Sequence, residues 1–182
     1  MKIFRNYLVA LGVMIFALNA CNSIPIIQEQ NVGPYFTVCV ESYAPYRQTF
    51  NIIDSLKNEL KKIDVETESD FAIFYERNVK TELKFHSIVG CILNSDAFAD
   101  SSLIIRLKRN NFMTREIGET KCMVIEVPFQ DFNTELRRNV GDKFDQYIKD
   151  NNYLPIPNGE NGITEIYKNG NIKFAAEIKP SK

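Results

Sequence analysis

The sequence has a single histidine, His86, and no tryptophan. It contains no HExxH or CxxC motif and no acidic loop of the calcium-binding kind, so no resident metal ion is predicted. The glycine-rich loops that hold nucleotide phosphates, GxGxxG and GxxxxGK[ST], are also absent. These absences exclude the common zinc, calcium and nucleotide-binding classes.

The sequence also has no excess of positive or negative charge. The chain has 22 Lys and Arg against 23 Asp and Glu, a net charge of −1, with no basic or acidic tail. Nucleic-acid binding needs a concentrated positive surface, so no nucleic-acid partner is predicted. Aromatic residues, in contrast, are plentiful, with 13 Phe and 8 Tyr. They indicate either an aromatic-rich interior or an aromatic pocket.

The N-terminus has the parts of a secretory signal. Lys2 and Arg5 supply positive charge, and residues 7–18 (YLVALGVMIFAL) form an apolar run. This run is shorter than the ~20 residues that a helix needs to span a membrane. The following residues, Leu18-Asn19-Ala20-Cys21, resemble the lipobox of bacterial lipoproteins.

We therefore predict that residues 1–20 are a signal peptide and that Cys21 carries a lipid. Asn22 follows the cysteine, in place of an Asp that would suggest retention in the inner membrane. The expected location is the cell envelope, at the outer membrane on its periplasmic or surface side. Two alternatives remain open, a secreted soluble protein and a weak uncleaved anchor. Residues 21–34 are predicted to form a polar tether between the lipid and one domain, residues 35–182.

Three cysteines remain if Cys21 is acylated. Cys39, Cys91 and Cys122 lie in apolar, strand-like runs without metal-ligand spacing. Buried thiols are the simplest expectation, and one disulfide is an alternative in an oxidising compartment. No adjacent base is present to activate any of them as a nucleophile.

Residues 35–182 show the order strand, helix, strand, strand twice. Strand-like runs are rich in aromatic and β-branched residues, and helical segments place apolar residues three or four apart. The first copy comprises residues 36–42, 46–63, 71–77 and 83–93. The second comprises residues 112–127, 132–148, 162–168 and 172–178, and a short helix at 101–108 links the copies. Asn169-Gly170 predicts a tight hairpin between the last two strands.

Each copy alone has too little core to be stable. Pairing the two copies predicts an α+β fold, in which a curved antiparallel sheet carries two long helices on one face. The other face of the sheet needs a separate explanation, and a concave groove between modules is a common place for a small-molecule site.

The order and spacing of several segments over about residues 35–180 resemble the GyrI-like effector-binding domains, which share a fold with the SOUL haem-binding proteins. The segments are Ala72-Ile73-Phe74-Tyr75, Ser87-Ile88-Val89-Gly90-Cys91-Ile92, Glu126-Val127-Pro128-Phe129, Tyr147-Ile148 and Thr164-Glu165-Ile166-Tyr167. The spacing from Phe71 to Leu93 is also similar to the domain of a membrane-anchored animal receptor of ER-phagy.

The GyrI-like resemblance implies a sheet that binds an amphipathic or cationic small molecule. Glu165 matches the glutamate that anchors the ligand in that family. Strand alternation places Tyr167 on the same face, and Ile73 and Tyr75 are their expected equivalents in the first copy. We expect these four residues to share a hollow on the face of the sheet away from the helices. The alternative is that Glu165 is a solvated strand residue and that the tyrosines cap the core.

His86 lies in a strand and belongs to no cluster, so an ordinary surface role is expected. The SOUL resemblance makes haem ligation a remote alternative, and no cofactor is predicted. Besides small-molecule binding, two functions remain open. The domain could serve protein interaction or structure with a vestigial pocket, with no partner named by the sequence. It could also be a small-molecule hydrolase in which Glu165 gives acid/base help, although no second group is visibly paired with it. Catalysis is not the favoured function, and no catalytic residue is assigned.

Overall fold

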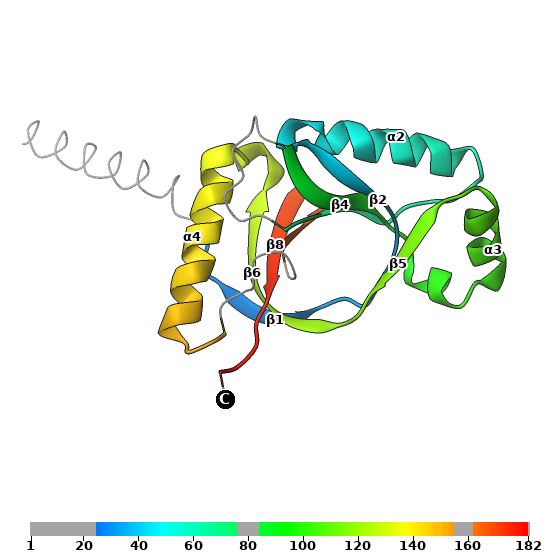
Figure 1. The fold of residues 1–182 in the computed structure, drawn as a ribbon. Coiled ribbons are helices and arrows are strands. Elements are labelled where there is room, and N and C mark those ends of the chain that lie inside the picture. The colour runs from blue at the N-terminus through cyan, green and yellow to red at the C-terminus, as the bar shows by residue number, and fades with distance from the viewer. Residues whose placement is uncertain (1–24, 76–83, 155–161, 182) are drawn as a thin grey trace, which may run out of the picture.

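A computed structural model describes residues 25–75, 84–154 and 162–181 (Figure 1). The strands are β1 (Gln28–Val32), β2 (Tyr35–Pro45), β3 (Ser69–Phe74), β4 (Lys84–Ile92), β5 (Met113–Ile117), β6 (Thr120–Pro128), β7 (Ile163–Lys168) and β8 (Asn171–Glu177). The α-helices are α2 (Thr49–Lys61), α3 (Ser101–Arg109) and α4 (Thr134–Asp150), and short 3-10 helices include η1 (Tyr46–Gln48) and η3 (Phe129–Asp131). The predicted signal peptide and Cys21 lie outside the described residues. No helix of the described part is long and apolar enough to cross a membrane.

The predicted repeat is confirmed. The first unit runs β2-α2-β3-β4 and the second runs β6-α4-β7-β8. All eight strands form one antiparallel sheet in the order β1-β6-β8-β7-β3-β4-β2-β5. The two units join at the centre, where β3 pairs with β7 and Ala72 lies opposite Glu165. The α+β fold class therefore follows from the pairing of two units that are each too small alone.

A bent ribbon joins the two edges of this curled half-barrel. β1 pairs with β6, and β2 pairs with β5, in one continuous register: Val32 lies opposite Thr120, and Tyr35 lies opposite Ile117. The bend falls at Gly33, where a Cβ atom would lie only 2.8 Å from the carbonyl oxygen of Gly118. The close approach of the two turns requires a residue without a side chain. The units are thus connected both through β3 and β7 and through this ribbon.

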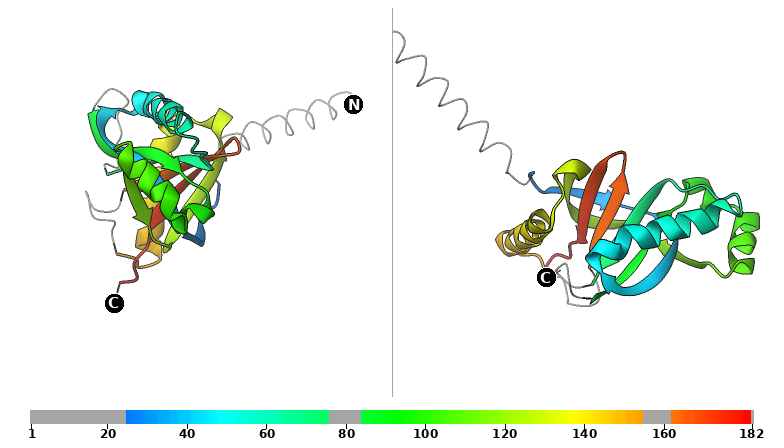
Figure 2. Two further views of the ribbon diagram at one scale, coloured as in Figure 1. Left: turned by 90° about the vertical axis from the view of Figure 1, so that its right-hand side faces the viewer. Right: turned by 90° about the horizontal axis from the view of Figure 1, so that it is seen from above.

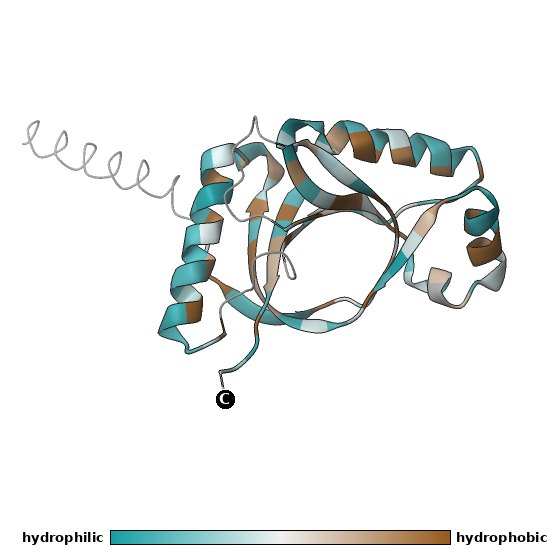
Figure 3. Ribbon diagram, in the orientation of Figure 1, coloured by the Kyte–Doolittle hydropathy of each residue, from teal (hydrophilic) through white to brown (hydrophobic). Residues whose placement is uncertain are grey.

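The two faces of the sheet are buried differently. The helix-side core lies between the sheet and α2, α3 and α4, which cover the outside of the curl (Figures 1 and 2). α4 is mainly hydrophilic, and its buried residues recur three or four apart (Figure 3). The buried set of α4 is Arg137, Val140, Gly141, Phe144 and Ile148. Inside the curl, a second and smaller core contains Phe71, Ile88, Ile92 and Val124. A strand buried on both faces needs a continuous apolar run, and Phe71–Phe74 of β3 and Ile88–Ile92 of β4 provide such runs.

Strand β1 lies within the predicted tether, so part of that segment belongs to the sheet instead. Its sequence, QEQNV, has no apolar alternation, and the strand is held by its backbone ladder and by Glu29. The Glu29 carboxylate lies 2.6 Å from Lys121 Nζ and accepts hydrogen bonds from the Tyr147 hydroxyl at 3.0 Å and the Tyr153 hydroxyl at 2.5 Å. The Lys121 and Tyr153 hydrogen bonds lower the pKa of Glu29 to about 2.

Local signals explain the helix and turn positions. Asn133 caps α4, because its side-chain oxygen accepts the Leu136 N–H at 2.8 Å. Asp100 caps α3 in the same way by accepting the Leu103 N–H at 3.0 Å. Asn169 and Gly170 both have positive φ in the β7–β8 hairpin, as the Asn-Gly signal predicted.

Candidate functional site

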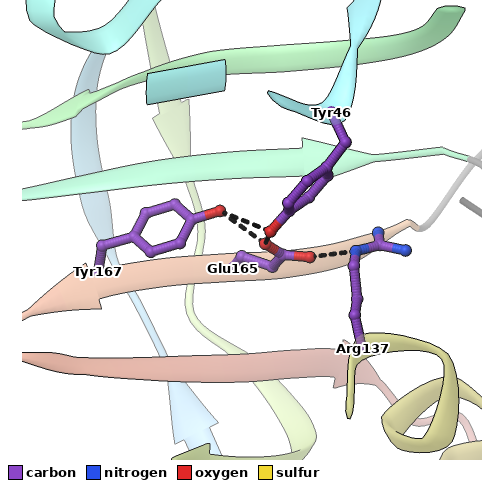
Figure 4. Close-up of polar contacts among 4 residues, drawn as sticks. All are labelled: Tyr46, Arg137, Glu165 and Tyr167. Carbon is purple, nitrogen blue, oxygen red and sulfur yellow. Dashed lines mark hydrogen bonds and ion pairs between the residues drawn. The ribbon is translucent and has the colours of Figure 1, made fainter. Parts of the chain in front are cut away.

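Glu165 lies in the middle of β7 with none of its surface exposed, facing the helix-side core. Its Oε1 atom accepts a hydrogen bond from Arg137 Nε at 2.5 Å. Its Oε2 atom accepts from the hydroxyls of Tyr46 and Tyr167, both at 2.6 Å (Figure 4). We call these four residues the Glu165 cluster. A buried carboxylate is tolerated only with such partners, because its desolvation is otherwise prohibitive.

Arg137 comes from the first buried position of α4, and only 2% of it is exposed. Its guanidinium carbon lies 4.7 Å from the centre of the Phe74 ring and 5.3 Å from that of Tyr46. Its Nε atom donates to Glu165, but its buried Nη2 atom has no hydrogen-bond partner among the described residues. The guanidinium is thus held by one ion pair and two ring faces and keeps an unused donor.

The two tyrosines of the cluster remain protonated at every physiological pH. Burial, reinforced by the Glu165 charge, raises the pKa of Tyr167 well above its usual range. The pKa of Tyr46 is raised for the same reasons. Both phenols are therefore hydrogen-bond donors to Glu165, and they are unsuited to act as bases at neutral pH.

A group of aromatic rings covers this cluster. Phe50 of α2 makes edge contacts with Phe129 of η3 at 5.5 Å and with Tyr167 at 5.0 Å between ring centres. Phe132, just after η3, stacks against Phe129 at 6.3 Å and also contacts Tyr46 at 5.7 Å. Phe129 is 43% exposed, so the cover reaches the surface. We call Phe50, Phe129 and Phe132 the aromatic cover.

The predicted grouping of site residues is partly wrong. Glu165 and Tyr167 share a face, but it is the helix side of the sheet, whereas Ile73 and Tyr75 pack inside the curl. The residue opposite Glu165 is Ala72, and Ile73 lies opposite Thr164. A shift of one residue along a strand moves every side chain to the other face, so the assumed correspondence between the units was one residue out.

Ile73 and Tyr75 instead line a cavity of about 240 Å³ inside the curl. Residues from both edge strands and from the central strands surround it, including Val32, Tyr35, Ile117 and Ala175. The Tyr75 hydroxyl lies 3.4 Å from an Arg115 Nη atom at this cavity. The predicted residues therefore divide between the two faces of the sheet: Ile73 and Tyr75 line this cavity, whereas Glu165 and Tyr167 are buried on the helix side.

His86 packs between Tyr43 and Tyr75, with ring centres 4.7 Å from each. Its Nε2 atom lies 2.8 Å from the Glu41 carboxylate. That nitrogen is therefore engaged on the strand surface. Within the described part of the chain, no group of three or more His, Cys, Asp or Glu residues is placed to hold a metal ion.

The three cysteines that the structure describes are buried and free. Cys39 and Cys122 face the inside of the curl, and Cys91 faces the helix side. Burial raises the pKa of all three thiols, that of Cys91 to about 12. Thiols in this state are poor nucleophiles, as expected for structural cysteines.

Sequence reasoning missed Tyr46 and Arg137 as site residues. Both residues lie within the two predicted helices, residues 46–63 and 132–148, and neither was picked out as a partner for Glu165. The spacing of Arg137 nevertheless indicates a buried position, because it lies three residues before Val140 and seven before Phe144 on the same helix face. A buried arginine needs a buried partner of opposite charge. Glu165 is the acidic residue of β7 that meets this need.

No family model and no curated protein matches the chain. Among solved structures, it is similar to the C-terminal domain of EcmrR, with a TM-score of 0.61 and 11% identity over 86% of this chain and 100% of that one. EcmrR in a complex with DNA gives a TM-score of 0.61 and 11% identity over 99% of this chain and 68% of that one. The structure of SAV2435 bound to tetraphenylphosphonium gives a TM-score of 0.48 and 12% identity over 85% and 94% of the two chains. The likeness to EcmrR concerns the fold and agrees with the GyrI-like architecture that the resemblance implied.

Proposed function

We propose that this domain binds an amphipathic small molecule with an aromatic part at the Glu165 cluster, beneath the aromatic cover. The observation that supports this most is the concentration of a carboxylate, a guanidinium and two phenols in one buried place ringed by aromatic side chains. Buried polar groups that converge within an apolar, aromatic surround are typical of small-molecule sites. The GyrI-like resemblance of the residues around Glu165 points to the same place.

The ligand enters, in this proposal, between α2 and η3. The aromatic cover is made by one ring from the first unit, Phe50, and two from the second, Phe129 and Phe132. Separating an aromatic pair costs about 0.5–1.5 kcal/mol beyond the area that it buries, and a ligand ring inserted there replaces the lost contacts. The rings part by rotation of their side chains, because the backbone of η3 is held by the hydrogen bond that the Phe129 N–H donates to the Gly170 carbonyl at 2.7 Å.

The second part of the proposal is a membrane tether through Cys21. The supporting observation is the sequence of residues 1–21, with its positive start, short apolar run and lipobox. A domain held at a membrane surface meets amphipathic molecules at the place where they accumulate. Mass spectrometry of the mature protein checks this: a diacylglyceryl group on an N-terminal Cys21 is expected, and an unmodified Cys21 would rule the tether out.

The hydrolase alternative has less support. The Glu165 carboxylate already receives three hydrogen bonds, and both neighbouring phenols are held as donors. A general base needs a free lone pair facing the substrate or a water molecule. Small-molecule binding makes no such demand on the cluster.

Binding is tested on the chain from residue 21 onward with Cys21→Ser, so that no lipid competes for the probe. The probes are N-phenyl-1-naphthylamine, which is neutral and fluoresces in apolar surroundings, naphthalene-2-carboxylate and 2-naphthylmethylammonium. At least one is expected to bind, and Phe129→Ala is expected to weaken that binding about threefold to tenfold, because an exposed cover ring is lost. Ile105→Ala, an exposed residue of α3, is the control. No binding by any probe, or an equal effect of both variants, would refute the proposal.

A further inference from the structure

We infer that the ligand carries an anionic or strongly accepting group, such as a carboxylate, which hydrogen-bonds to Arg137, and that it is not a cation paired with Glu165. This inference deepens the proposed function and rests on it. It concerns the chemical class of the ligand at the same site, and it reverses the preference for cations that a lone buried glutamate suggests.

The first step is the charge of the cluster. Glu165 is ion-paired to Arg137, with 2% of the arginine side chain and none of the glutamate side chain exposed. Tyr46 and Tyr167 are neutral donors to the same carboxylate. The cluster therefore presents no unbalanced negative charge to a cation. An incoming cation would have to expel a guanidinium that is already in place.

The second step is the hydrogen-bond inventory. Both carboxylate oxygens of Glu165 are occupied, Oε1 by Arg137 and Oε2 by the two phenols. In contrast, Arg137 Nη2 is buried and has no acceptor among the residues that the structure describes. A guanidinium has five N–H donors and no acceptor, so it can be satisfied only by an oxygen or another acceptor. The unused capacity of the cluster is thus a charged donor.

The third step concerns the rings. The guanidinium of Arg137 already lies over Phe74 and Tyr46, which are the positions where a ligand cation would gain from the ring faces. The remaining rings, those of the aromatic cover and Tyr167, contact one another by edges and offset faces. They can receive a flat aromatic group without any charge on it. An aromatic acid therefore uses both the free donor and the free rings.

The experiment compares naphthalene-2-carboxylate with 2-naphthylmethylammonium by isothermal titration calorimetry on the same Cys21→Ser chain. The two probes share their ring system and differ in the sign and hydrogen-bonding role of the attached group. We expect the carboxylate to bind about tenfold to a hundredfold more tightly, the range that charge-assisted hydrogen bonds give. Equal affinities or a tighter ammonium would overturn the inference.

Variants locate the effect at Arg137. Arg137→Met is expected to abolish the preference for the carboxylate, because it removes the charged donor and leaves Glu165 with its two phenol donors but no positive partner. Arg138→Met changes the exposed neighbour on the same helix and is expected to leave the preference unchanged. Arg137→Lys keeps the charge but loses the planar guanidinium, so a smaller preference for the carboxylate is expected. This variant replaces Arg137→Met in the test if the methionine variant does not fold. An identical preference in the Arg137 and Arg138 variants would overturn the inference.

The outcomes separate the two proposals. If no naphthalene probe of any charge binds, the proposed function itself fails. If probes bind and Phe129→Ala weakens them, but the ammonium binds as well as the carboxylate, only the inference on ligand charge fails.

Discussion

The buried ion pair between Arg137 and Glu165 gives the sharpest stability prediction. Arg137→Met leaves a buried carboxylate with two phenol donors but no positive charge, and Glu165→Gln leaves a buried guanidinium with no negative charge. Removal of one partner of a buried pair costs about 3–5 kcal/mol in the free energy of unfolding. For a domain of this size, that cost lowers the melting temperature by roughly 6–20 °C.

The double variant decides whether the ion pair itself is responsible. With both charges gone, the side chain at position 165 still accepts from Tyr46 and Tyr167, so the two single costs should not add. We expect the double variant to be more stable than the sum of the single effects predicts, by at least about 2 kcal/mol. Urea unfolding followed by circular dichroism measures all four proteins, with Arg138→Met as an exposed control on α4. Additive costs would refute the argument that the two charges depend on each other.

Three other predictions concern Glu29, two glycines and the buried cysteines. Glu29 has its pKa lowered from 4.5 to about 2, so its stabilising contribution is complete above pH 4.5 and is lost as the pH falls toward 2. The protection of the β1 amides from hydrogen exchange, measured relative to the unfolded chain at the same pH, should fall over that window, and Glu29→Gln should flatten the fall. Gly141 lies in α4, where a Cβ would meet only Ile163 Cδ1 at 4.0 Å, so Gly141→Ala should raise the free energy of unfolding by about 0.5–1 kcal/mol. Gly90→Ala should lower the free energy of unfolding sharply, because its Cβ would lie 2.2 Å from the Val38 carbonyl oxygen. Thermal melts that rank these two variants in the opposite order would contradict the packing. Iodoacetamide should label Cys39, Cys91 and Cys122 only after unfolding, as read by mass spectrometry, and rapid labelling of the native chain would show that they are not buried.

The sequence predicted the architecture well because both repeat units carry strong local signals. Apolar spacing in α2 and α4 and the Asn-Gly turn between β7 and β8 are confirmed at nearly their predicted positions. Strand β1 could not be found in this way, because its polar sequence offers no alternation and it is held by backbone pairing to β6. The helix-side position of Glu165 was also missed, since an entirely apolar strand such as residues 71–75 gives no indication of which face is which.

The composition of the site was harder to predict than the fold. Glu165 and Tyr167 are brought together as expected, but their partners come from other elements, Tyr46 from η1 and Arg137 from α4. Sequence separations of 119 and 28 residues from Glu165 exceed what local periodicity can connect. A search for apolar residues three or four apart does not find Arg137, because Arg137 is a charged residue at a buried position of α4.

The bent ribbon that joins the edges of the sheet limits how the molecule can move. The two repeat units are tied together on one side by β3 and β7 and on the other by β1, β2, β5 and β6. Two-part receptors usually close on a ligand by rotation of one rigid unit about a hinge. Here such a rotation would break the backbone hydrogen bonds of one of these connections. Under the proposed function, adaptation to ligands of different size is therefore expected in the rotamers of the aromatic cover, while the strands keep their arrangement.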